Sequence, residues 1–167
     1  MDGSLAIVGY MGSGKSTLGH LLARALRLEF VDLDRAIVKK AGKEIPEIFA
    51  ERGEKHFRDL EHEALRDALR GRSPTVVACG GGVVVRPENW SLLRDVKTVF
   101  LREDTDVLYE RTRGTGRPLR ATSREEFVRR YTERLTFYRE VADIEVEVGG
   151  RQPAEAAEEV LGWLSRR

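Results

Sequence analysis

The 167-residue sequence has little cysteine, no excess of charge of either sign and no long apolar run. A single cysteine, Cys79, excludes an internal disulfide, and we expect a cytoplasmic protein. No stretch approaches the roughly 20 apolar residues of a membrane span, and the N-terminus lacks the order of a signal peptide, so we expect no membrane association. The 29 basic and 28 acidic residues give a net charge of +1, which argues against nucleic-acid binding.

Short apolar runs alternate along the chain with segments of helical periodicity. The runs predict strands at 5–8, 29–32, 75–78, 98–101 and 144–148. The periodic segments predict helices at about 15–27, 34–41, 45–52, 54–69, 87–93, 104–112, 124–140 and 153–165. This alternation is typical of an α/β sandwich around a parallel sheet, in which ligands bind at the carboxyl ends of the strands. The length predicts a single domain over residues 1–167.

Residues 9–16, GYMGSGKS, match the phosphate-binding loop pattern of two glycines followed by lysine and a hydroxyl residue. A predicted strand precedes the loop and a predicted helix follows it, which is the context that phosphate binding requires. The loop N–H groups can point inward, Lys15 can reach the outer phosphates, and Ser16 can ligate Mg²⁺. The alternative is a glycine-rich turn before a helix. The predicted ATP contacts here are Gly12, Ser13, Gly14, Lys15, Ser16 and Thr17.

Two carboxylates, Asp32 and Asp34, stand at the end of the second predicted strand. Residues two apart on a strand share a face, so one carboxylate can face a metal while the other faces an acceptor hydroxyl. The alternative interpretation of Asp34 is an N-cap of the next helix.

Two further features stand near predicted strand ends. Arg58 and Glu61 are three apart and therefore share a helical face, where they could grip and orient a substrate carboxylate or form an exposed ion pair of little energetic worth. Residues 80–82 are three glycines directly after a strand, which suit close approach of the backbone to a ligand or a plain tight turn.

Residues 111–120 are rich in glycine and arginine and have no apolar period. One interpretation is a lid that closes over phosphates and brings a cation to them. The other is a solvated surface loop.

The phosphate loop, Asp-x-Asp, Gly-Glu-x-x-Phe-Arg-x-x-Glu, the glycine triplet and Arg-Pro-Leu follow one another in an order that resembles the shikimate kinase family over nearly the whole chain. The resemblance implies a P-loop fold like that of nucleoside monophosphate kinases. This fold is a three-layer α/β/α sandwich with a five-stranded parallel sheet in the order 2-3-1-4-5. The resemblance also implies substrate-binding helices at about 33–61 and a lid at about 112–123.

The same resemblance implies a reaction and its residues. The family transfers the γ-phosphate of ATP to the 3-hydroxyl of shikimate with Mg²⁺, on the chorismate route to aromatic amino acids. The catalytic residues it implies are Asp34 as the base, Lys15, and Arg117 as the lid arginine that moves onto the transferred phosphate. The implied Mg²⁺ ligands are Ser16 and Asp32, and the implied shikimate ligands are Asp34, Arg58, Gly80, Gly81, Gly82 and Arg134. Arg111, Arg117, Arg151 and Gln152 complete the implied ATP contacts.

Two other functions remain open from the sequence. A related P-loop kinase could act on another small hydroxy acid such as gluconate, although two arginines beside Asp34 favour shikimate. A nucleotide-binding regulatory module without turnover is the alternative from another class, but such a module has no need of Asp34. We expect ATP and shikimate as the partners and a monomer as the working state.

Overall fold

Five parallel strands form the centre of the computed structural model, which describes residues 3–115 and 123–166. The strands are β1 (Leu5–Gly9), β2 (Glu29–Asp32), β3 (Thr75–Ala78), β4 (Lys97–Arg102) and β5 (Ile144–Glu147). Their order in the sheet is β2-β3-β1-β4-β5, which confirms the predicted topology. β1 is the central strand, and all five of its residues are buried, as expected for a strand covered on both faces.

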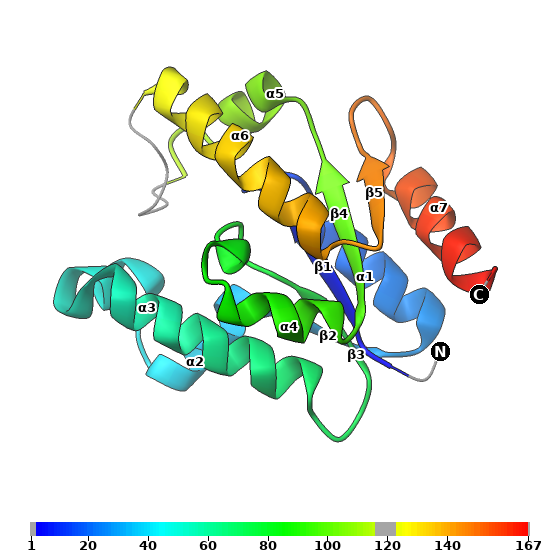
Figure 1. The fold of residues 1–167 in the computed structure, drawn as a ribbon, viewed down its shortest axis with the longest axis horizontal. Helices are drawn as coiled ribbons and strands as arrows, with labels where there is room; N and C mark the ends of the chain where they lie inside the picture. Colours follow the sequence, from blue (N-terminus) through cyan, green and yellow to red (C-terminus); the bar gives the residue numbers. More distant parts are fainter. Residues whose placement is uncertain (1–2, 116–122, 167) are drawn as a thin grey trace.

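Helices cover both faces of this sheet and make three layers (Figure 1). They are α1 (Lys15–Leu26), α2 (Leu33–Ala41), α3 (Ile45–Leu69), η1 (Val83–Val85), α4 (Glu88–Arg94), α5 (Thr105–Arg111), α6 (Arg124–Val141) and α7 (Pro153–Ser165). α1 and α7 pack on one face, around a core that includes Leu18, Leu22 and Val160. α3, α4 and α6 pack on the other face, around a second core that includes Leu65 and Leu93.

The segment 45–69 agrees with its prediction as two helices. The two helical stretches, labelled together as α3, meet at a kink at Gly53, whose backbone angles of φ 75° and ψ 179° are not helical. A side chain is rarely tolerated at this φ, so the glycine accounts for the kink. Because of the kink, the first turns of α3 run in a different direction from the part that carries Arg58.

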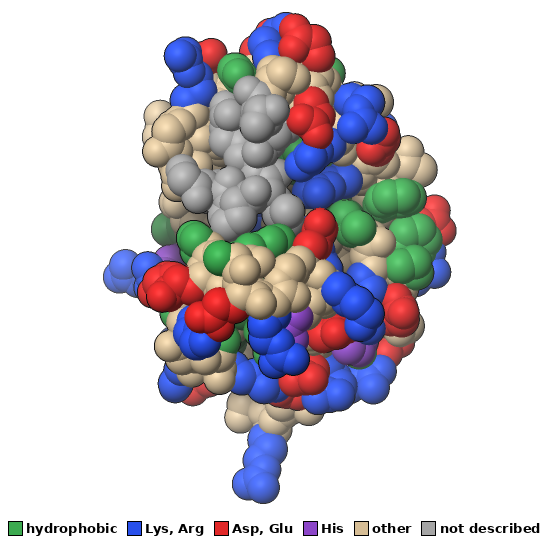
Figure 2. Space-filling view, turned by 90° about the vertical axis from the view of Figure 1, so that its left-hand side faces the viewer, with side chains coloured by type: hydrophobic (Ala, Val, Ile, Leu, Met, Phe, Trp, Pro, Cys, Tyr) green, Lys and Arg blue, Asp and Glu red, His purple; other side chains and the backbone are tan. Residues whose placement is uncertain are grey.

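Basic and acidic side chains are interspersed over the face shown in Figure 2. This distribution agrees with the nearly balanced charge of the chain. Within residues 3–115 and 123–166, no helix combines the length and the apolar character that crossing a bilayer requires.

Two adjacent leucines of α1 allow a matched test of this packing. Leu22 is fully buried, whereas the side chain of Leu21 is 37% exposed. We expect Leu22→Ala to lower the free energy of unfolding by about 2–5 kcal/mol, because the cavity it leaves cannot fully collapse. Leu21→Ala should change it by no more than about 0.5 kcal/mol. Urea unfolding of both variants measures the difference, and equal losses would contradict this assignment of the core.

Candidate active site

Three cavities lie in series along the carboxyl ends of the strands. The first has a volume of about 280 Å³ and is lined by Met11, Asp34, Glu44, Ile45, Pro46, Phe49, Phe57, Arg58, Glu61, Gly80, Gly81, Gly82, Thr115 and Arg134. The second, of about 490 Å³, surrounds the glycine loop and shares Asp34, Gly80, Gly81 and Thr115 with the first. The third, of about 350 Å³, lies toward α7 and shares Gly12, Gly14, Thr17 and Arg111 with the second.

The glycine loop between β1 and α1 has the geometry of a phosphate-binding loop. Gly12 and Gly14 have φ values of 82° and 91°, which favour glycine, and Gly14 is the N-cap of α1. Lys15 begins the helix, and its Nζ donates a hydrogen bond of 2.8 Å to the carbonyl of Tyr10. The N–H groups of the first helical turn and the Lys15 ammonium therefore face the second cavity with positive charge.

Ser16 and Asp32 are brought together as predicted. The Ser16 hydroxyl donates to Asp32 Oδ2 at 2.9 Å, while Asp32 Oδ1 accepts from the backbone N–H of Arg35 at 3.2 Å. A hydroxyl and a carboxylate beside a phosphate cavity are oxygen donors of the kind that Mg²⁺ takes together with substrate phosphates and water. Within the described part of the chain, no cluster of three or more His, Cys, Asp or Glu residues could hold a metal. The pair thus fits a magnesium bound largely through a nucleotide.

Asp34 lies on a helix, whereas the sequence interpretation of the two carboxylates places it at the end of a strand. β2 ends at Asp32, and Asp34 lies in the first turn of α2, so alternation along a strand does not bring the two carboxylates together. The alternative that Asp34 is the N-cap is wrong, because Asp32 caps α2. Asp34 lines both the first and the second cavity. Its carboxylate therefore stands at the boundary between them.

Arg58 and Glu61 form a buried ion pair, so the alternative of an exposed pair is wrong. Arg58 Nη1 donates to Glu61 Oε1 at 2.6 Å, and the two side chains are only 10% and 1% exposed. Burial raises the pKa of the Glu61 carboxyl, and the charge of Arg58 opposes this shift. Arg58 Nη2 is buried and has no hydrogen-bond partner among residues 3–115 and 123–166. It is therefore available to an anionic group in the first cavity.

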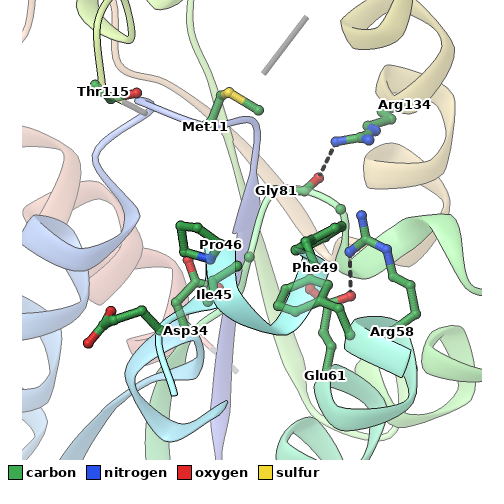
Figure 3. A pocket seen from close by; sticks show the side chains of 14 residues that line it. Met11, Asp34, Ile45, Pro46, Phe49, Arg58, Glu61, Gly81, Thr115 and Arg134 are labelled. Atoms are coloured by element: carbon green, nitrogen blue, oxygen red, sulfur yellow. Dashed lines mark hydrogen bonds and ion pairs between the residues drawn. The ribbon is translucent and has the colours of Figure 1, made fainter. Parts of the chain in front are cut away.

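Arg134 of α6 approaches the same cavity from another direction. Its Nη1 donates to the carbonyl of Gly81 at 3.3 Å, and its guanidinium lies 5.3 Å from the centre of the Tyr10 ring. Figure 3 shows Arg134 and Arg58 on one side of the cavity and Asp34 on the other. This arrangement suits a small molecule with a carboxylate at one end and a hydroxyl at the other.

The three glycines form a tight turn, and a residue with a side chain at any of the three positions would displace a neighbouring group. The N–H of Val83 closes the turn by donating to the carbonyl of Gly80 at 3.1 Å. A Cβ at Gly82 would overlap Arg58 Nη2, and one at Gly81 would lie 3.1 Å from the N atom of Met11. The segment is thus a tight turn, which was one of the two interpretations of the sequence. Its backbone also lies close to Arg58 and to the phosphate loop.

Three of the predicted ATP contacts, Arg111, Arg151 and Gln152, lie at the third cavity. Arg111 Nη1 donates to the carbonyl of Gly12 at 2.5 Å, and its Nη2 lies 3.4 Å from Glu103 Oε2. Arg151 Nη1 donates to Glu159 Oε2 of α7 at 2.6 Å, and Gln152 caps that helix. All three line the cavity. The predicted lid arginine, Arg117, lies outside the described residues.

Apolar residues of the first cavity were not predicted from the sequence. Ile45, Pro46 and Phe49 lie between Asp34 and the arginines in Figure 3, and Phe57 also lines the cavity. Their only signal is helical periodicity, and periodicity does not distinguish a cavity wall from a core.

Comparison with known proteins agrees with this geometry. The family model described as shikimate kinase matches residues 11–165. The chain belongs to the shikimate kinase family. A shikimate kinase of Dictyoglomus turgidum is 38% identical to it, covering 98% of both chains. Among solved structures, a shikimate kinase from Acinetobacter baumannii in complex with shikimate has a TM-score of 0.91 and 32% identity, covering 98% of this chain and 93% of that one. A shikimate kinase from Aquifex aeolicus has a TM-score of 0.86 and 35% identity, covering 97% and 96%.

Membership of the shikimate kinase family confirms the predicted family, fold class and enzyme class. It also decides among the functions left open by the sequence, and neither a kinase of another hydroxy acid nor a module without turnover is favoured.

Two glutamates that pair with Arg58 provide a matched test of the buried ion pair. Glu61 is 1% exposed and lies 2.6 Å from Arg58, whereas Glu54 is 55% exposed and lies 3.5 Å away. Glu61→Ala should lower the free energy of unfolding by about 3–5 kcal/mol, because it leaves a buried guanidinium without its partner. Glu54→Ala should have an effect several times smaller. Chemical denaturation compares the two, and similar losses would show that burial of the pair does not matter.

Proposed function

We propose that this chain transfers the γ-phosphate of ATP to the 3-hydroxyl of shikimate and does so with the residues placed here around the three cavities. The observation that carries the assignment of residues is the position of Asp34 on the wall shared by the first and second cavities. An acceptor in the first cavity and a triphosphate in the second would meet at this carboxylate. Family membership supports the reaction itself.

The first cavity is proposed to bind shikimate. The buried Nη2 of Arg58 and the guanidinium of Arg134 lie where they can bind the carboxylate of the acceptor. The apolar wall, including Phe49 and Phe57, can pack against the carbon ring. The backbone of Gly80, Gly81 and Gly82 can approach the hydroxyls closely, because these residues carry no Cβ.

Asp34 is proposed to orient the 3-hydroxyl and to accept its proton. The hydroxyl oxygen forms a bond to the γ-phosphorus as the bond from that phosphorus to the bridging oxygen breaks, and ADP leaves. The proton of the hydroxyl passes to a carboxylate oxygen of Asp34. In phosphoryl transfer, positioning and charge stabilisation supply most of the catalysis, so in-line placement of the acceptor is the principal contribution of this residue.

The second cavity is proposed to bind the phosphates of ATP. The loop N–H groups and Lys15 neutralise the phosphate oxygens, and Ser16 and Asp32 would hold Mg²⁺. Bound there, Mg²⁺ neutralises the charge that develops on the β- and γ-phosphate oxygens. We assign to Arg117, in a lid at about 112–123, the role of a further cation on the transferred phosphate.

The third cavity is proposed to bind the adenine of ATP. Arg111 lines both the second and the third cavity, and Arg151 and Gln152 line the third. The remaining parts of the proposal are a single domain with substrate-binding helices at about 33–61, a cytoplasmic location and a monomer.

A coupled assay of ADP release, with ATP, Mg²⁺ and shikimate, tests the proposal directly. We expect turnover that requires all three components. Gluconate in place of shikimate should give no turnover, because its open chain lacks the carbon ring that the apolar wall can pack against. Turnover with gluconate, or none with shikimate, would refute the assigned acceptor.

Asp34→Asn tests the proposed base. The amide keeps the size of the side chain but cannot accept the proton, so we expect kcat to fall by at least about a hundredfold while affinity for ATP stays nearly intact. Asp95→Asn, at the end of α4, is the control and should leave both unchanged. Steady-state kinetics and nucleotide titration measure the two quantities, and a kcat near the wild-type value would remove Asp34 from this role.

Arg134→Gln tests the proposed carboxylate ligand. Loss of one charged contact should cost about 2 kcal/mol, which corresponds to a KM for shikimate raised roughly thirtyfold. Arg129→Gln is the matched control, because Arg129 is on the same helix but exposed and paired with Glu133. The KM for ATP should change little in either variant. An equal rise in both KM values would point to a general disturbance of the fold instead.

A further inference from the structure

The carbonyl of Gly81 accepts hydrogen bonds from two side chains of α6. One is Arg134, whose Nη1 lies 3.3 Å away, and the other is the hydroxyl of Tyr138. The two donors are four positions apart and therefore lie on the same face of the helix. Arg134 belongs to the proposed shikimate site, whereas the sequence analysis assigned no role to Tyr138.

Tyr138 is built into the core as a fixed donor. Its side chain is fully buried, and its ring stacks on Phe100 of β4 with the ring centres 5.0 Å apart. Burial raises the pKa of its hydroxyl, so the proton stays on the oxygen and is available to the carbonyl of Gly81. Loss of this hydrogen bond would leave a buried hydroxyl without a partner, which is destabilising, so the folded protein favours the bonded arrangement.

The peptide that Tyr138 holds contacts three parts of the proposed site. A Cβ at Gly81 would lie 3.1 Å from the N atom of Met11, so the turn packs on the start of the phosphate loop. The next residue, Gly82, packs so closely on the guanidinium of Arg58 that a Cβ there would overlap it. The carbonyl of Gly81 itself holds Arg134. A shift of this one peptide would therefore disturb both arginines.

We propose that Tyr138 is a positioning residue for the acceptor: its hydroxyl fixes the Gly81 carbonyl and, through it, the glycine turn and Arg134. The inference rests on the proposed function, because it assigns shikimate to the first cavity. Tyr138 does not line that cavity, so it acts through the peptide it holds and through its side-chain contact with Arg134. Its loss should thus affect binding of the acceptor more than the chemical step or binding of ATP.

Tyr138→Phe removes the hydroxyl and keeps the ring. We expect the KM for shikimate to rise about three- to tenfold, with the KM for ATP within twofold of wild type and kcat within threefold. Tyr131→Phe is the matched control, because Tyr131 lies two turns away on α6, is also buried, and donates to the carbonyl of Glu103 at 3.2 Å. The Tyr131→Phe variant loses a comparable hydrogen bond that does not involve the glycine turn. Its KM for shikimate should stay within twofold of the wild-type value.

A rescue separates hydrogen bonding from packing. 4-Aminophenylalanine at position 138 keeps the ring and restores an N–H donor, so the KM for shikimate should return toward the wild-type value. 4-Fluorophenylalanine, of similar size but without a donor, should behave as Tyr138→Phe does, and it provides the same comparison if the phenylalanine variant does not fold.

The outcomes distinguish this inference from the function on which it rests. Absence of turnover with shikimate in the wild-type chain would refute the proposed function. If the wild type is active, an unchanged KM for shikimate in Tyr138→Phe, an equal rise for both substrates, an equal rise in Tyr131→Phe or a failed rescue by 4-aminophenylalanine would overturn the role of Tyr138.

Discussion

The buried ion pair of Arg58 and Glu61 is the interaction on which the acceptor side of the site depends. A guanidinium in the interior is costly unless its charge is matched and its donors are used, and Glu61 provides the match at 2.6 Å. The pair leaves Nη2 of Arg58 buried without a partner among the described residues. An anionic substrate could supply that partner. The guanidinium of Arg58 can thus both stabilise the fold through Glu61 and select an anionic substrate through Nη2.

This ion pair also constrains the chain around it. Because Arg58 is held against Glu61, its guanidinium occupies the space where a side chain at position 82 would otherwise stand. The glycine at 82 is therefore a consequence of the buried arginine. The kink at Gly53 has a related effect, because it lets one element carry both the apolar wall around Phe49 and the cation at Arg58. Wall and cation then face a common cavity.

The sequence allowed the sheet order and the phosphate loop to be predicted, because both depend on local patterns or on a family resemblance. β1 is a continuous buried run, and the glycine loop is defined by eight adjacent residues. The strand at 29–32 was predicted correctly, but Asp34 lies beyond its end in the first turn of α2, where the alternation of a strand no longer applies. Spacing placed Arg58 and Glu61 on one face, but it could not show that this face is buried. The bond from Tyr138 to Gly81 joins residues 57 positions apart, and no local pattern could have predicted it.

The positions of Asp32 and Asp34 are fixed relative to each other by the N-cap of α2. Asp32 accepts from the N–H of Arg35 through one oxygen and from Ser16 through the other, so a single side chain ends the strand, starts the helix and contacts the phosphate loop. Asp34 lies two residues further on, in the turn that this cap holds in place. If Mg²⁺ binds at Ser16 and Asp32, its position and that of the proposed base are set by one short, hydrogen-bonded segment. The start of one helix would then hold the metal-bound phosphate and the acceptor hydroxyl in the relative position that in-line transfer requires.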